Sequence, residues 1–134
     1  MATITSIYKG QLRTEATHTA SGTTIITDAP VDNHGRGEAF SPTDLACAAL
    51  ASCMMTIMGI VADRDGIDLV GTSIDITKTM SASPRKIAQI DIVMHVSNKN
   101  LTDDQKLKLE RAAHTCPVAL SLHPEVVQKM EFVY

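Results

Sequence analysis

The chain has 134 residues, a length that suits one domain with a single hydrophobic core. Hydrophobic residues make up 44% and charged residues 20%, a balance that excludes a disordered chain. The formal net charge is −3 and lysine and arginine are scattered, which argues against nucleic acid or an anionic membrane as a partner.

The first 28 residues predict three short antiparallel strands. β-Branched residues alternate with polar ones there, and turns are expected at Gly10 and at Ser21-Gly22. The strands are predicted over residues 4–10, 11–19 and 23–28. Residues 29–40 are rich in proline, asparagine, glycine and charge, so a loop is expected to follow.

The N-terminal residues do not resemble an export signal, because no basic segment precedes an apolar one. We therefore expect a cytoplasmic protein. Thiols stay reduced in that compartment, so the three cysteines are not expected to form a structural disulfide framework.

A long helix is predicted from Ser41 to about Ala62. Ser41 suits the N-cap, Pro42 suits the first helical position, and Asp44 completes a capping box. From Leu45 to Ala62 eighteen residues carry no charge, which is long enough for a membrane span. Acidic residues flank both ends and there is no positive-inside bias, so a buried core helix is favoured. Because so small a chain can hardly enclose a helix that is apolar on every face, a partner subunit is expected.

A β-hairpin is predicted next, from residues 72–80 and 86–98 with the connection at Ser83-Pro84. Both segments alternate with period two, as half-buried strands do. The second segment carries an apolar stripe of Ile90, Ile92, Met94 and Val96.

A second helix is predicted from Thr102 to about Thr115, because Thr102 and Gln105 form a capping box. Its apolar face comprises Leu109, Ala112 or Ala113, and Cys116. Pro117 interrupts the helix and starts a short one, and residues 126–134 form a last strand. The pattern predicts a single α+β domain over residues 1–134, with antiparallel sheets around the long central helix.

The three cysteines are Cys47, Cys53 and Cys116. Cys47 and Cys53 lie about 120° apart around one helix, so they can neither pair with each other nor bind one metal together. No cysteine–histidine set has zinc spacing, and His114 close to Cys116 is weak evidence, so neither a metal nor another cofactor is expected. From composition alone, all three cysteines suit small core residues.

Two local motifs contain these cysteines. The first is SPTDLACAALASC, a helix started by proline with Cys53 eleven residues after Pro42; the second is HTCPVALSL, with Cys116 at a helix break. Together, in this order and spacing, they resemble the OsmC/Ohr family of organic hydroperoxide reductases. The order of the elements agrees with the family over nearly the whole chain. The run TDAPVDNHGRGEAFSPTDL is similar to a particular OsmC-like branch.

The resemblance implies an OsmC-like fold in an intertwined homodimer with two sites at the subunit interface. It also implies that Cys53 is the peroxidatic cysteine and Cys116 the resolving one. A hydroperoxide would oxidise Cys53 to a sulfenic acid, Cys116 would condense with it to a disulfide, and a small dithiol such as a dihydrolipoyl group would reduce that disulfide.

A thiol in an apolar pocket needs a nearby cation to ionise. In the family an arginine supplies it, held by a glutamate at the third position of the helix-start motif, where this chain has Thr43. Arg13 is the first candidate for the arginine, with Glu15 on the same strand face, and Arg36 is the rival. Both also suit ordinary surface charges. Asp44 is an alternative carboxylate, although its capping position explains it without catalysis.

Two hypotheses follow from the sequence. The first is a cytoplasmic, homodimeric thiol peroxidase for organic hydroperoxides that uses Cys53, Cys116 and Arg13, with the Met- and Leu-rich helix lining an apolar pocket. The second is a non-enzymatic ligand-binding or redox-responsive protein of the same fold, because Thr43 replaces the glutamate.

Overall fold

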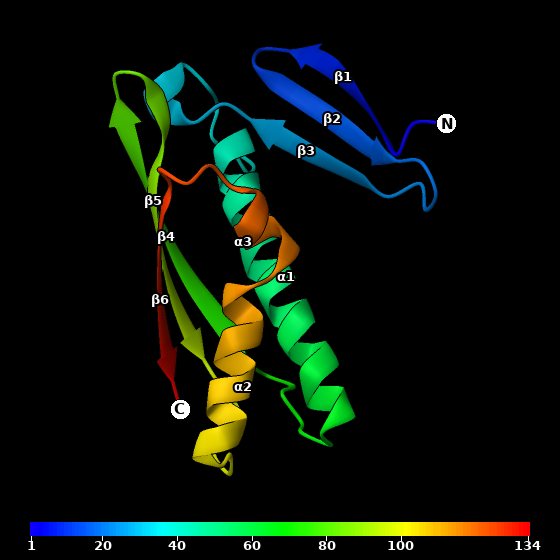
Figure 1. The fold of residues 1–134 in the computed structure, drawn as a ribbon. Coiled ribbons are helices and arrows are strands. Elements are labelled where there is room, and N and C mark those ends of the chain that lie inside the picture. Colours follow the sequence, from blue (N-terminus) through cyan, green and yellow to red (C-terminus); the bar gives the residue numbers. More distant parts are fainter. The chain divides into compact units, whose positions relative to one another are not determined.

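The computed structural model describes all residues from Met1 to Tyr134. They group into two compact units, Met1–Ala46 and Cys47–Tyr134 (Figure 1). Each unit is described by itself, and the prediction of a single domain stays a prediction.

The first unit contains the three-stranded sheet β1-β2-β3, formed by Ile4–Gly10, Arg13–His18 and Thr24–Asp28. Both strand pairs are antiparallel, as predicted. The second strand begins two residues later than predicted, because Gln11 and Leu12 adopt positive φ angles of 53° and 62° and make the turn together with Gly10. The predicted loop contains a short 3-10 helix, η1, over Val31–Asn33.

The long helix α1 spans Pro42–Arg64. Its start is capped as predicted, because the Asp44 backbone N–H donates to Ser41 Oγ at 3.0 Å. In return, the Ser41 backbone N–H donates to an Asp44 carboxylate oxygen at 3.1 Å. The helix ends two residues later than predicted, at Arg64, and the chain then turns at Gly66 with a φ of 68°.

The second unit contains the sheet β4-β5-β6, formed by Ser73–Ala82, Arg85–His95 and Val127–Val133. β4 and β5 form the predicted antiparallel hairpin. β5 and β6 are parallel, so the prediction of purely antiparallel sheets was wrong here. Two parallel strands need a crossover connection. The two helices between β5 and β6 return the chain to the end of the sheet at which β5 begins, so that β6 can run in the same direction.

α2 (Asp103–His114) and α3 (Pro117–Ser121) form that crossover. The predicted capping box of α2 is present, since the Gln105 backbone N–H donates to Thr102 Oγ1 at 3.1 Å and the Thr102 N–H donates to Gln105 Oε1 at 2.9 Å. In Figure 1 the helices of this unit lie on one face of the sheet β4-β5-β6.

The core of the second unit lies between this sheet and the helices. Sheet residues Ile90, Ile92, Met94 and Val96 have exposed fractions of 1% or less, which confirms the predicted stripe. Facing them are residues of α1 and α2, namely Leu50, Met54, Met58, Leu109 and Ala113. The core is therefore aliphatic and Met-rich, as the scarcity of aromatic residues requires.

α1 is the helix that by length and composition could cross a membrane. That test is weak evidence, because the core helix of a soluble protein also meets it. Six of its residues are buried in the structure, among them Leu50, Met54 and Met58. As expected for so small a chain, the helix is not enclosed on all sides, since Met55 and Ile60 remain 36% and 44% exposed.

Candidate functional site

The two cysteines of α1 have different surroundings. Cys47 is buried, with 4% of its surface exposed, as expected of a core residue. Cys53 is half-buried and packs against the core cluster. Of the two thiols, only the Cys53 thiol combines partial exposure with contact to the core.

Cys116 lies at the junction of α2 and α3. Pro117 cannot continue α2, so Cys116 adopts extended geometry and becomes the N-cap of α3. Its side chain is completely buried, and its Sγ accepts a hydrogen bond from the Ala119 backbone N–H at 3.4 Å. The helix break therefore holds this sulfur in a fixed position inside the core.

The Cys53 and Cys116 side chains lie close enough to interact. Burial raises the pKa of the Cys116 thiol, and the neighbouring Cys53 side chain raises that pKa further. None of the three cysteines forms a disulfide in this structure. The fold thus brings together the two thiols that the sequence motifs singled out, from α1 and from the junction of α2 and α3.

Arg13, in the first unit, is held by a carboxylate that the sequence reasoning missed. Its Nε and Nη2 donate to the two carboxylate oxygens of Asp28 at 2.7 and 2.8 Å. Nη2 also lies 3.5 Å from Glu38. The hydrogen bond from Arg13 lowers the pKa of Asp28 and keeps it ionised, although burial opposes this. The ion-pair partners of Arg13 are thus Asp28 and Glu38, whereas Glu15 was the carboxylate expected on the same strand face.

The strand register contains the signal that identifies Asp28. β2 and β3 pair with Thr17 opposite Thr24, and counting back along both strands places Arg13 opposite Asp28. Directly opposed residues of antiparallel strands lie close enough for side-chain contact. A two-residue turn at Ser21-Gly22 would instead pair Arg13 with Pro30, so the predicted turn alone does not give this register.

The other predicted residues have separate partners. Arg36 donates from Nη2 to Gln11 Oε1, and Asp44 caps α1. His95 lies 2.9 Å from Asp75, and His114 is exposed with its ring 6.0 Å from that of Phe132. No three His, Cys, Asp or Glu residues lie close enough to hold a metal ion.

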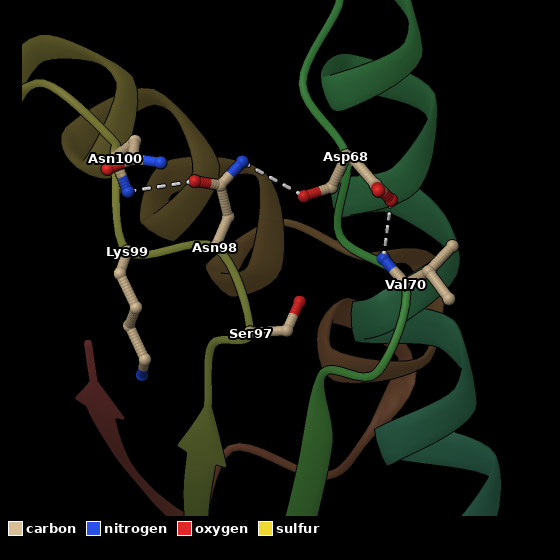
Figure 2. A pocket seen from close by; sticks show the side chains of 6 residues that line it. All are labelled: Asp68, Val70, Ser97, Asn98, Lys99 and Asn100. Atoms are coloured by element: carbon tan, nitrogen blue, oxygen red, sulfur yellow. Dashed lines mark hydrogen bonds between the residues drawn. The ribbon is translucent and has the colours of Figure 1, made fainter.

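The cavities of the second unit include two that are lined by neither Cys53 nor Cys116. One is small and mostly apolar, beside Met55, Met58, Leu69 and Thr72. Figure 2 shows the other, an open polar hollow between the segments that follow α1 and β5, lined by Asp68, Val70, Ser97, Asn98, Lys99 and Asn100. Asn98 Nδ2 donates to the Asp68 carbonyl at 3.1 Å, so the polar groups join the two segments.

The sequence profile described as OsmC-like protein matches residues 35–131. The chain belongs to the OsmC-like family. Comparison with curated proteins finds no significant match.

Solved structures resemble this OsmC-like chain over nearly its whole length. A candidate osmotic stress induced and detoxification response protein from Psychrobacter arcticus has a TM-score of 0.95 and 48% identity, covering 98% of this chain and 96% of the other. Organic hydroperoxide resistance protein OsmC from Legionella pneumophila has a TM-score of 0.77 and 21% identity, with coverages of 100% and 98%. OhrB of Bacillus subtilis has a TM-score of 0.66 and 21% identity, with coverages of 98% and 97%. The last two show the α+β OsmC-like fold alone.

Proposed function

We propose that this OsmC-like protein is a thiol-dependent peroxidase that reduces organic hydroperoxides. The observation that supports this proposal best is the proximity of the Cys53 and Cys116 side chains, whose thiols influence each other. A half-buried thiol beside a second, buried thiol is the arrangement needed to form a sulfenic acid and then to resolve it as a disulfide.

The reaction balances in three steps. The Cys53 thiolate attacks the distal oxygen of the hydroperoxide, the O–O bond breaks, and the alkoxide leaves and takes a proton to become an alcohol. The Cys116 thiol then condenses with the Cys53 sulfenic acid, which forms the disulfide and releases water. A small dithiol reduces the disulfide by two exchange steps and is itself oxidised to a disulfide; a dihydrolipoyl group is one candidate.

Arg13 is proposed as the cation that favours the Cys53 thiolate. A positive donor near sulfur lowers the free energy of the thiolate relative to the thiol. Support for Arg13 over Arg36 comes from its partners: a buried carboxylate binds the Arg13 guanidinium in two places, whereas Arg36 contacts the exposed Gln11.

The proposed assembly is a homodimer in the cytoplasm. In the first unit the buried residues are Thr27, Asp28 and Ser41, all of them polar, and the sheet leaves large apolar side chains exposed. Those exposed side chains are Ile4, Ile7, Tyr8, Leu12, Ile25 and Ile26. A second copy of the chain would cover such a surface, as the resemblance implies.

The first test is peroxide consumption by the Cys53→Ser variant. With tert-butyl hydroperoxide and dihydrolipoamide, wild type is expected to turn over, and Cys53→Ser to lose all activity above the uncatalysed rate. Cys47→Ala, which changes a buried thiol outside the proposed site, is the matched control and is expected to stay active. Equal, slow consumption by wild type and Cys53→Ser would reject the enzyme in favour of a ligand-binding or redox-responsive protein.

A further inference from the structure

The chain lacks a carboxylate at the position where the family resemblance places the partner of the arginine. That position is Thr43, whose hydroxyl lies 3.3 Å from the Ser41 hydroxyl at the start of α1. Asp44, the next residue, caps the helix. If the guanidinium of Arg13 is held in one orientation, a group other than residue 43 must hold it.

Asp28 has the geometry that such a group requires. It binds Arg13 in two places, at Nε and Nη2, and a planar guanidinium held at two points cannot rotate about its long axis. The Asp28 side chain is completely buried, while 24% of the Arg13 side chain remains exposed. The carboxylate is thus enclosed and the cation is accessible.

The backbone around Asp28 is fixed as well. Its register opposite Arg13 is part of the β2–β3 ladder. The Asp28 N–H donates to the Phe40 carbonyl at 3.0 Å, which ties the end of β3 to the segment just before α1. The β2–β3 pairing and the hydrogen bond to Phe40 therefore hold the Asp28 carboxylate in one place. The carboxylate in turn holds the Arg13 guanidinium.

Glu38 is a weaker partner of the same guanidinium. It lies 3.5 Å from Nη2, and its side chain is 64% exposed. Exposed ion pairs at such distances contribute little, because water competes for both charges. With Asp28 on Nε and Nη2 and Glu38 beside Nη2, Nη1 remains available as a donor.

We propose that Asp28 is the positioning residue of Arg13 and performs in this chain the task that the resemblance assigns to a glutamate at position 43. This inference rests on the proposed function, in which Arg13 assists Cys53. Asp28 touches neither thiol nor peroxide in this proposal. It holds the edge of the guanidinium formed by Nε and Nη2, which fixes the orientation of Nη1, the donor through which Arg13 would act in the proposed function.

The ion pair is neutral as a whole, but its charges are not evenly placed. The negative charge lies behind the guanidinium, and the free Nη1 hydrogens lie at the opposite edge. A hydrogen bond donated directly to a thiolate favours that ionised form. Precise placement of the donor therefore matters more here than the net charge of the pair.

The test compares two carboxylates that share one arginine. Asp28→Asn keeps the size of the side chain but removes its charge, and Glu38→Gln makes the matched change at the exposed partner. Two readouts are measured: kcat/KM with tert-butyl hydroperoxide, and the midpoint of the pH dependence of Cys53 alkylation, followed by mass spectrometry of the Cys53 peptide. Both are repeated for Arg13→Gln and for the double variant Arg13→Gln/Asp28→Asn.

Asp28→Asn is expected to lower kcat/KM by on the order of 10- to 100-fold and to move the alkylation midpoint upward. Glu38→Gln is expected to stay within about threefold of wild type. The double variant should be no worse than Arg13→Gln alone, because a positioning residue acts only through the group it positions. Fully additive losses, or a wild-type midpoint in Asp28→Asn, would overturn the inference.

The controls separate this inference from the function on which it rests. If Arg13→Gln retains wild-type activity, the proposed role of Arg13 is wrong and Asp28 has nothing to position. If Arg13→Gln is impaired but Asp28→Asn is not, only the role of Asp28 is wrong. Should Asp28→Asn be unfolded at the assay temperature, Asp28→Glu replaces it. Its longer carboxylate displaces the guanidinium, so lower kcat/KM in a folded variant supports the inference and wild-type kcat/KM rejects it.

Discussion

At the scale of residues, Cys116 shows how a helix break holds a buried thiol in a fixed position. Pro117 makes Cys116 an N-cap, so its sulfur accepts the Ala119 N–H and faces Cys53 at the same time. Burial raises the pKa of Cys116, which keeps it a neutral thiol at neutral pH. In the proposed resolution step Cys116 must lose this proton, which leaves with the sulfenic hydroxide as water, because the thiolate is the form that attacks sulfur.

Cys116→Ser tests the resolving role with little structural change, because a serine hydroxyl caps a helix as well. We expect the first oxidation by peroxide to proceed, while the Cys53 sulfenic acid accumulates and is trapped by dimedone. Turnover with dihydrolipoamide should fall. Mass spectrometry detects the dimedone adduct, and Cys47→Ala serves as the control. Normal turnover with no trapped adduct would assign resolution to another group.

At the scale of elements, both long helices begin with a reciprocal capping box. In α1 the pair is Ser41 and Asp44, and in α2 it is Thr102 and Gln105. Each pair satisfies backbone N–H groups that a helix start leaves without partners. These caps define where α1 and α2 begin, and α2 in turn ends at His114, two residues before Cys116.

Thr102→Ala is expected to lower the free energy of unfolding by about 1 kcal/mol, because the Gln105 N–H loses its acceptor. Thr102→Ser keeps the hydroxyl and should be close to wild type. Urea denaturation at one fixed protein concentration measures both variants. Since the cap lies at the end of α2 remote from Cys116, peroxidase activity should be unchanged. An unaltered denaturation midpoint in Thr102→Ala would show that the capping box does not contribute to the free energy of unfolding.

At the scale of the whole molecule, the distribution of apolar surface favours assembly. α1 is apolar on all sides, yet the chain covers only part of it, and Met55 and Ile60 remain exposed. β1 exposes Ile4, Ile7 and Tyr8 along an edge strand. Long exposed apolar edges promote association unless they are covered.

Light scattering is therefore expected to give wild type a mass of twice the 14.4 kDa chain. Ile60→Lys places a charge on the exposed side of α1 and should shift the protein toward monomer, because burying an unpaired charge is costly. Val70→Lys, in the hollow shown in Figure 2, makes the same kind of change at a polar site and should stay dimeric. A monomeric wild type at micromolar concentration would reject the dimer.

The elements themselves could be predicted because their signals are local. Caps at Ser41 and Thr102, the break at Pro117 and the alternation in β4 and β5 each depend on neighbours within a few residues. The same locality explains the small errors. Whether a strand starts at residue 11 or 13 is decided by the turn conformation of Gln11 and Leu12, which alternation does not reveal.

Contacts between distant residues were decided by the tertiary structure. The resemblance named Cys53 and Cys116, but their contact depends on how α1 packs beside the junction of α2 and α3. The sequence alone placed Arg13 on a strand, and only the register of β2 against β3 assigned Asp28 as its partner. The parallel pairing of β6 likewise follows from the crossover through two helices. Local chemistry determines where elements begin and end, whereas packing and register bring together side chains that are far apart along the chain.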